Sequence, residues 1–288
     1  MSGVAVIVAY ALRESLRRRV FLVVVVLTAA FVALYWLGAE KAFDQVDANE
    51  PPPAAALAGI DTRTLTGATL FGLSMFGTLF LGAVLAAFLT LGVVRGDAER
   101  GLLQPLVVRP IGRSSLLVGR FLAAAGVCTV YVLAVFGANL WITWETGDWR
   151  PDRIAAPAIQ LAAAVAVVAA LSLLGSVFLS ATANGIAVFM ILGAGLVAGL
   201  LGQIGEVLDS QTLENVATIS SWVLPFEALY QDGLNAITAD TRGFTEFALQ
   251  LGPFGGAQAA GPFLWPWTIA YLAIVGGIAT AAFARKDL

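Results

Sequence analysis

The side chains that could do chemistry are scarce in this sequence, and their types exclude most kinds of catalysis. Among 288 residues there is no histidine and a single cysteine, Cys128, which lies inside an apolar run. A Ser–His–Asp or Cys–His nucleophile therefore cannot be built from this chain. A zinc, haem or copper site formed by this chain alone is not expected either, because imidazole and thiolate ligands are missing. We expect no catalytic residue and no metal site.

Nucleotide hydrolysis is excluded by the sequence around the two lysines. A phosphate-cradling loop ends in Gly-Lys-Ser or Gly-Lys-Thr, whereas Lys41 precedes Ala42 and Lys286 precedes Asp287. The chain is therefore expected to bind no cofactor of its own and to be no enzyme.

Positive charge is concentrated in one short stretch, ERGLLQPLVVRPIGRSSLLVGR, which covers residues 99–120. Its four arginines are Arg100, Arg109, Arg113 and Arg120. The apolar residues between them recur at helical spacing and are Leu102, Leu103, Leu106 and Val107. An apolar face rimmed by arginine indicates a protein partner or the lipid surface. Nucleic acid would require a larger basic field without interspersed acids, so we expect no nucleic-acid partner.

The composition shows what surrounds this stretch. Hydrophobic residues make up 59% of the chain and charged residues only 12%, with a mean hydropathy of +0.87. Soluble domains carry about one quarter charged residues, and several apolar runs here reach the roughly 20 residues that a membrane-spanning helix needs. The sequence predicts an all-α polytopic membrane protein, with one transmembrane domain covering residues 1–288.

Apolar runs bounded by charge, proline or glycine predict six spans. They cover residues 20–37, 65–94, 121–142, 154–179, 185–201 and 267–283. The second run has no charge over about 45 Å of helix, so it must tilt or protrude. None of the six contains Asp, Glu, Lys, Arg or His. This lack disfavours an ion-coupled carrier, which usually holds ionisable groups at membrane depth.

The charge distribution predicts the orientation. With six spans and both termini in the cytoplasm, the cytoplasmic segments hold most of the 16 basic residues: Arg13, Arg17, Arg18, Arg19, Arg95, Arg100, Arg109, Arg113, Arg120, Arg285 and Lys286. Those segments contain only four acids, whereas the outer segments contain most of the 19. This bias fits the positive-inside rule, and all seven tryptophans fall at or beyond the predicted outer ends of the spans.

An amphipathic helix is predicted ahead of the first span, over residues 1–19. Its apolar stripe consists of Val4, Ile7, Val8, Ala11, Leu12 and Leu16. We expect this helix to lie on the inner leaflet, and packing against protein is the alternative. The arginines expected to anchor it at the membrane surface are Arg13, Arg17, Arg18 and Arg19.

The longest outer loop, residues 202–266, contains the partly amphipathic sequence EVLDSQTLENVATISSWVLPFEALYQDGLNAI. We expect short helices here that cap or re-enter the outer face. Just before it, Gly195 and Gly199 form a GxxxG pair that permits close helix approach. Packing within the protein is favoured over a dimer face for this pair. Asn139 and Asn184 are expected near span ends.

The arginine-containing stretch resembles the cytoplasmic signature of ABC type-2 transporter permeases. The matching positions are Glu99, Gly101, Leu103, Pro110, Ile111, Arg113, Leu117, Gly119 and Arg120. The resemblance extends over the chain, through the six spans and the long last outer loop with VLPFEAL. Three positions depart from the family pattern: Leu102 replaces a frequent Thr, Gly112 a Ser, and Arg120 a Lys.

The resemblance implies a membrane subunit of an exporter in the cell membrane, with residues 95–120 as the coupling loop. Residues implied to contact a separate ATPase subunit are Glu99, Gly101, Leu102, Leu103, Leu106, Pro110, Arg113, Gly119 and Arg120. ATP would act through that partner, and a second copy or a homologous permease would complete the transporter.

Within the family, YALRESLRRRVFLVVVVL resembles permeases linked to the maturation of multicopper enzymes. The absence of histidine and the scarcity of Cys and Met argue against direct copper binding by this chain. A secondary transporter or channel, and a membrane scaffold without transport, are the alternative functions. The sequence leaves the substrate open.

Overall fold

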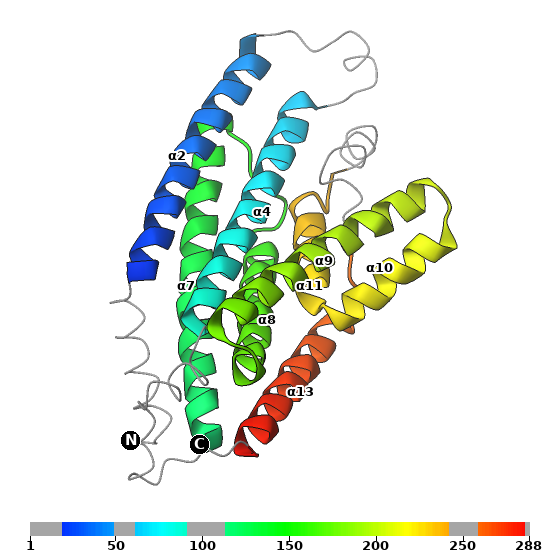
Figure 1. Cartoon of the computed structure of the whole chain (residues 1–288). Helices are drawn as coiled ribbons and strands as arrows, with labels where there is room; N and C mark the ends of the chain where they lie inside the picture. The colour runs from blue at the N-terminus through cyan, green and yellow to red at the C-terminus, as the bar shows by residue number, and fades with distance from the viewer. Residues whose placement is uncertain (1–18, 49–60, 91–112, 242–258, 286–288) are drawn as a thin grey trace.

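The computed structural model describes residues 19–48, 61–90, 113–241 and 259–285 (Figure 1). These residues form helices joined by turns and short connections. In chain order the helices are α2 (Arg19–Ala48), α4 (Thr62–Thr90), α7 (Arg113–Gly147), α8 (Ala155–Phe178), α9 (Ala181–Val207), α10 (Gln211–Val223), α11 (Pro225–Ile237) and α13 (Leu264–Ala284). The all-α fold predicted from the sequence is confirmed over this part of the chain.

Six of the helices, α2, α4, α7, α8, α9 and α13, are long and apolar enough to cross a membrane. Each of the six predicted spans is therefore confirmed as a helix over its described residues, although the ends of three of them differ clearly from the prediction. The first was expected to end at residue 37 but continues to Ala48. The third was expected over residues 121–142 but covers Arg113–Gly147, and the fifth was expected over residues 185–201 but covers Ala181–Val207. With 35 residues, α7 is about 52 Å long and must project beyond a hydrocarbon core of about 30 Å.

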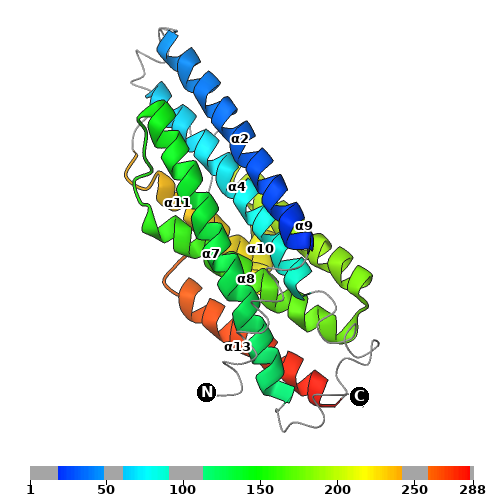
Figure 2. The same ribbon diagram turned by 90° about the vertical axis from the view of Figure 1, so that its left-hand side faces the viewer.

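The helices cross the bundle in alternating directions (Figures 1 and 2). We call the end where α7 begins and α13 ends the proximal end, and the end where α2 ends and α4 begins the distal end. The innermost helices are α4 and α8, because 67% of the most apolar window of each is buried, compared with 17% in α2. The remaining spans pack around this pair.

The residues between α9 and α13 include two short helices, as the amphipathic pattern predicted. Helix α10 packs along α9 without burying any residue, and the two project together from the bundle (Figure 1). Helix α11 instead enters the protein and packs mainly against α8. Its buried face contains Phe226, Leu229 and Leu234. Of the two short helices, only α11 re-enters the bundle.

Aromatic side chains fit against glycines where the first three spans meet. A Cβ added at Gly67 would overlap Trp149, one at Gly77 would overlap Phe31, and one at Gly147 would overlap Phe43. Larger residues at these glycines would therefore push the aromatic rings out of the contacts that join α2, α4 and α7.

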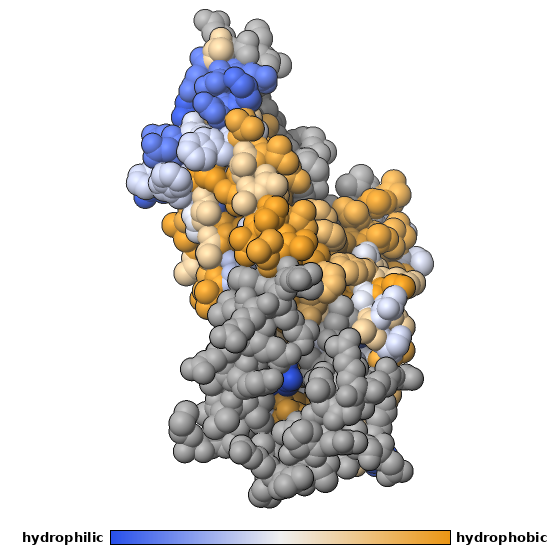
Figure 3. All heavy atoms as spheres, turned by 60° about the vertical axis from the view of Figure 1, so that its left-hand side comes forward, coloured by the Kyte–Doolittle hydropathy of each residue, from blue (hydrophilic) through white to orange (hydrophobic). Residues whose placement is uncertain are grey.

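On the face that Figure 3 shows, the coloured residues form an apolar band and, above it, a hydrophilic distal end. The hydrophilic end includes the exposed residues Glu40, Lys41 and Asp44 of α2. Large apolar side chains such as Leu34 and Val130 are exposed below it. A surface of this kind suits contact with lipid, because water would be a poor solvent for so much contiguous apolar area.

Candidate functional site

The residues expected to contact an ATPase lie mostly outside the described part of the chain. Glu99, Gly101, Leu102, Leu103, Leu106 and Pro110 all fall in residues 91–112. Arg113, Gly119 and Arg120 are described and lie in the first two turns of α7, where Gly119 is buried. Of the predicted membrane-anchoring arginines, Arg13, Arg17 and Arg18 are likewise outside the described residues, and Arg19 begins α2.

The first turns of α7 are fixed to the proximal ends of two other helices. Leu117 of α7 packs with Leu173 and Val177 of α8 and with Ala279 and Phe283 of α13 in a separate apolar cluster. All five side chains are buried. The point where the chain passes from residues 91–112 into α7 therefore has a defined position relative to α8 and α13.

Hydroxyl pairs join α2 to α7 in the apolar part of the bundle. The hydroxyls of Thr28 and Tyr131 are 2.6 Å apart, and those of Tyr35 and Thr143 are 2.5 Å apart. Such pairs satisfy polar groups that would otherwise be buried without a partner, and they hold neighbouring spans together. The sequence analysis did not single these residues out, because isolated Thr and Tyr give no pattern along one helix.

Asn139 and Asn184 are both buried, and each donates a hydrogen bond to a neighbouring helix. Asn139 is fully buried about two turns before the end of α7, where its Nδ2 donates to Oγ1 of Thr78 at 3.3 Å. Asn139 was expected near a span end; α7 continues past it to Gly147, and the position of Asn139 relative to the membrane boundary stays a prediction. Asn184 does lie near the start of α9, but it is buried and donates to the Ser172 carbonyl of α8 at 2.9 Å.

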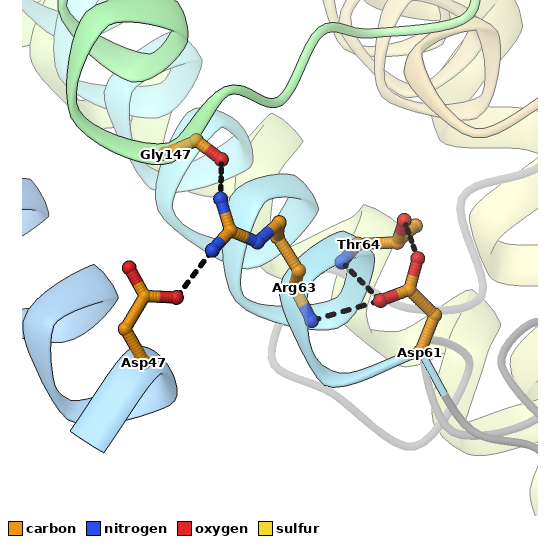
Figure 4. A network of polar contacts seen from close by, with 5 residues as sticks. All are labelled: Asp47, Asp61, Arg63, Thr64 and Gly147. Carbon is orange, nitrogen blue, oxygen red and sulfur yellow. Dashed lines mark hydrogen bonds and ion pairs between the residues drawn. The ribbon is translucent and has the colours of Figure 1, made fainter. Parts of the chain in front are cut away.

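An arginine ties three helices together at the distal end (Figure 4). Arg63, at the start of α4, donates to the Gly147 carbonyl of α7 at 2.7 Å and pairs with Asp47 of α2. Asp61 accepts hydrogen bonds from the backbone N–H of Arg63 at 3.0 Å and from the hydroxyl of Thr64 at 2.6 Å. It thereby satisfies donors at the start of α4, as a helix-capping residue does.

Helix α11 is tied to α8 by a second polar contact. Nε2 of Gln160, which is buried, donates to Asp232 of α11. The other carboxylate oxygen of Asp232 accepts from the backbone N–H of Ala260 at 2.8 Å. Nearby, the Asp152 N–H donates to the Ile237 carbonyl at 3.1 Å. The C-terminal half of α11 is therefore held against α8 and its preceding loop.

A carboxyl group is buried where α11 meets α9. Glu227 is 4% exposed, and its Oε1 accepts a hydrogen bond from Nε2 of Gln231 at 2.8 Å. Desolvation by burial raises the pKa of Glu227 to about 7, although the hydrogen bond from Gln231 opposes the shift. Sequence analysis missed this residue. The signal was a single acid inside the apolar run VLPFEAL.

The GxxxG pair of α9 forms the other side of this contact. A Cβ at Gly195 would overlap the ring of Phe226, and a Cβ at Gly199 would overlap Oε1 of Glu227. The interpretation that this pair serves packing within the protein is confirmed. Small residues here let α11 come close enough to bury Glu227.

The described residues contain no group of three or more His, Cys, Asp or Glu side chains placed to hold a metal ion.

Comparison with known proteins identifies a family for nearly the whole chain. A search of curated proteins found no match. Residues 5–288 match the family described as ABC-2 family transporter protein. The membrane permeases of this family lack a nucleotide-binding domain, and the six apolar helices make this chain a multi-pass membrane protein. The chain belongs to the ABC-2 transporter family and is a membrane component of such a transporter.

Proposed function

We propose that this chain is the permease subunit of an ATP-driven exporter whose ATPase is a separate subunit. The observation that carries the proposal is the family match over residues 5–288, together with six helices that could span a membrane. Because the chain has no phosphate-cradling loop, nucleotide hydrolysis is assigned to the partner. Two permeases, either identical or homologous, and two ATPase subunits form the working transporter in the cell membrane.

Both termini are placed in the cytoplasm, so that the proximal end faces inward. The charge bias of the sequence supports this orientation, as do the tryptophans near the predicted outer ends of the spans. The alternating directions of the six helices are compatible with it (Figure 1). Residues 1–19 then lie along the inner leaflet as an amphipathic helix, with Arg13, Arg17, Arg18 and Arg19 among the headgroups.

Residues 95–120 are the proposed coupling loop of this single-domain permease, and residues 202–266 form its long outer loop. The leucines of the coupling loop enter a groove on the ATPase, while Glu99 and Arg113 hold its two ends. The buried cluster around Leu117 supports this assignment, because it would pass a force on the loop to α8 and α13. A loop attached to a mobile helix end would transmit less of that force.

A narrower proposal concerns the cargo pathway. The N-terminal sequence YALRESLRRRVFLVVVVL supports membership of the subgroup linked to multicopper-enzyme maturation. In that role the chain moves a compound needed for maturation and does not bind copper itself, since it contains no histidine.

The test of the coupling loop is Leu103→Asp in the full-length permease, co-expressed with its ATPase. A charge in a desolvated contact costs on the order of several kcal/mol of interface energy. We expect a monodisperse permease that no longer retains the ATPase in pull-downs and no longer transports.

Leu57→Asp is the matched control, because residue 57 lies between the first two spans on the proposed outer side. This variant should keep the partner and the transport activity. If Leu103→Asp retained full ATPase binding and transport, residues 95–120 would not be the surface that contacts the ATPase.

A further inference from the structure

The contact between α9 and α11 contains a titratable group that the proposed function does not use. Glu227 is buried with its Oε1 beside Gly199, and its one polar partner among the described residues is Gln231. The amide of Gln231 is only half satisfied, because its Oε1 is buried without a hydrogen-bond partner. A carboxylate cannot supply that missing donor, since an ionised acid only accepts hydrogen bonds.

The helices packed against α11 offer no cation that could pair with an ionised Glu227. Helix α8 contains no titratable residue. The titratable residues of α9, α10, α13 and α4 are, respectively, Glu206, Glu214, Tyr271 and Arg63. Helix α11 itself adds Tyr230 and Asp232. The single cation in these helices, Arg63, lies at the start of α4 and is bound to Asp47 and Gly147.

Protonation of Glu227 would remove both the unpaired buried charge and the lack of a donor for Gln231. A neutral carboxyl group avoids the cost of burying an unpaired charge. Its O–H is also a hydrogen-bond donor, which is what the unpaired amide oxygen of Gln231 lacks, and Gln231 already donates to Glu227. The shift of the Glu227 pKa to about 7 agrees with this geometry and has the same cause, desolvation.

We propose that Glu227 is a proton-binding site between α11 and α9: the packed arrangement carries the protonated carboxyl, and loss of the proton separates the first half of α11 from α9. The opposite half stays in place, because Asp232 is bound to Gln160 and the Ile237 carbonyl to the Asp152 N–H. Separation exposes the carboxylate to water and removes it from the apolar contact with Gly199.

Tyr230, a second buried titratable group of α11, does not titrate together with Glu227. Its hydroxyl is buried without a hydrogen-bond partner, one helical turn from Glu227. Burial raises the pKa of this phenol, and the negative charge of Glu227 raises it further. Tyr230 therefore stays neutral while Glu227 titrates, so a single carboxyl group governs the contact.

The test is hydrogen exchange, followed by mass spectrometry, of the purified full-length chain in lipid nanodiscs. Wild type and Glu227→Gln are compared at the same pH, which cancels the intrinsic pH dependence of exchange. Near pH 9 we expect amides in the first half of α11 to exchange at least about tenfold faster in wild type than in the variant. Near pH 5 the two should agree.

Glu214→Gln on α10 is the control, because it removes a carboxyl group from a neighbouring helix and should behave as wild type. Should Glu227→Gln fail to fold, the ratio of α11 exchange to α8 exchange in wild type alone must still rise between pH 5 and pH 9. An unchanged ratio, or equal exchange in wild type and Glu227→Gln near pH 9, would overturn the proposal.

Hydrogen exchange in sodium and in potassium distinguishes a proton site from a metal-cation site. If replacing potassium by sodium near pH 9 slows α11 exchange to the level of Glu227→Gln, the site binds a metal cation and the proton proposal fails. The experiment uses neither ATP nor an ATPase subunit, so its outcome is independent of the coupling loop.

Discussion

Two of the acidic side chains that join helices in this protein, Asp47 and Glu227, do so in opposite surroundings. Asp47 pairs with Arg63 at the distal end, where the side chains are 59% and 38% exposed, respectively (Figure 4). Glu227 connects α11 to α9 with 4% exposure, and an uncharged amide is its partner. Both side chains of the first contact are charged and solvated, whereas an ionised Glu227 would be a buried charge without a cationic partner in the described part of the chain.

The comparison shows that an exposed pair of opposite charges can contribute less to stability than a single buried carboxyl group. Water screens the exposed pair, and measured pairs of this kind contribute about 0–1 kcal/mol. Glu227 has lost its hydration without gaining a cation, so its protonation state decides whether the contact is favourable. Mutations at the two places should therefore differ in size, in pH dependence and in salt dependence.

The largest expected effect is the loss of stability as Glu227 ionises. Its pKa is about 7 in the folded protein against a model-compound value of 4.5. Because the folded-state value is the higher one, the stabilisation is complete below about pH 4.5 and is lost as pH rises to about 7. The linkage relation converts this shift to a loss on the order of 3 kcal/mol. Unfolding of the purified chain in detergent, followed at several pH values, measures it.

Glu227→Gln should lack this pH-dependent loss, so its stability would exceed that of wild type near pH 8. Glu214→Gln should reproduce the wild-type curve. The prediction fails if the unfolding free energy of wild type stays constant between pH 4.5 and 7, or if Glu227→Gln shows the same pH-dependent loss. In either case ionisation of the buried carboxyl group would have no special effect on stability.

The next effect concerns the glycine that accepts Glu227. A Cβ at Gly199 would overlap the carboxyl group, whereas a Cβ at Gly193, on the same helix, would meet nothing within 4 Å. Gly199→Ala should destabilise the protein by about 1–3 kcal/mol through overpacking. Gly193→Ala should be neutral or stabilising by up to about 1 kcal/mol, because alanine favours helix. Equal midpoints for both variants in a thermal unfolding assay would contradict the close approach of α9 and α11.

The sequence was sufficient to predict the six spans, because hydrophobic length is a local property of the chain. It failed at the distal ends of α2 and α7, where charged residues such as Glu40 and Lys41 suggested loop. These turns remain helical because tertiary packing continues past the apolar run: Phe43 of α2 is buried against Gly147 of α7. A contact between residues so far apart leaves no trace in either local pattern.

The site around Glu227 could be predicted only in part. The amphipathic pattern indicated short helices, and the GxxxG pair indicated close packing on α9. Nothing in the local sequence indicated that these two features contact each other, because Gly199 and Glu227 are far apart in the sequence and only the tertiary fold brings them together. The coupling residues show the reverse case: Glu99 and Leu103 stand out by their spacing, yet they fall outside the described residues and stay a prediction.

The smallest expected effect is at the exposed pair itself. Asp47→Asn removes one charge and leaves Arg63 bound to the Gly147 carbonyl, so it should cost about 0.5 kcal/mol or less, and less still at high salt. Arg63→Met also leaves that carbonyl without its donor and should cost about 1 kcal/mol. Unfolding midpoints at low salt and at 0.5 M NaCl test both changes. If Asp47→Asn cost as much as Gly199→Ala and kept that cost in high salt, the exposed pair would contribute as much as the buried contact, and the contrast between the two places would fail.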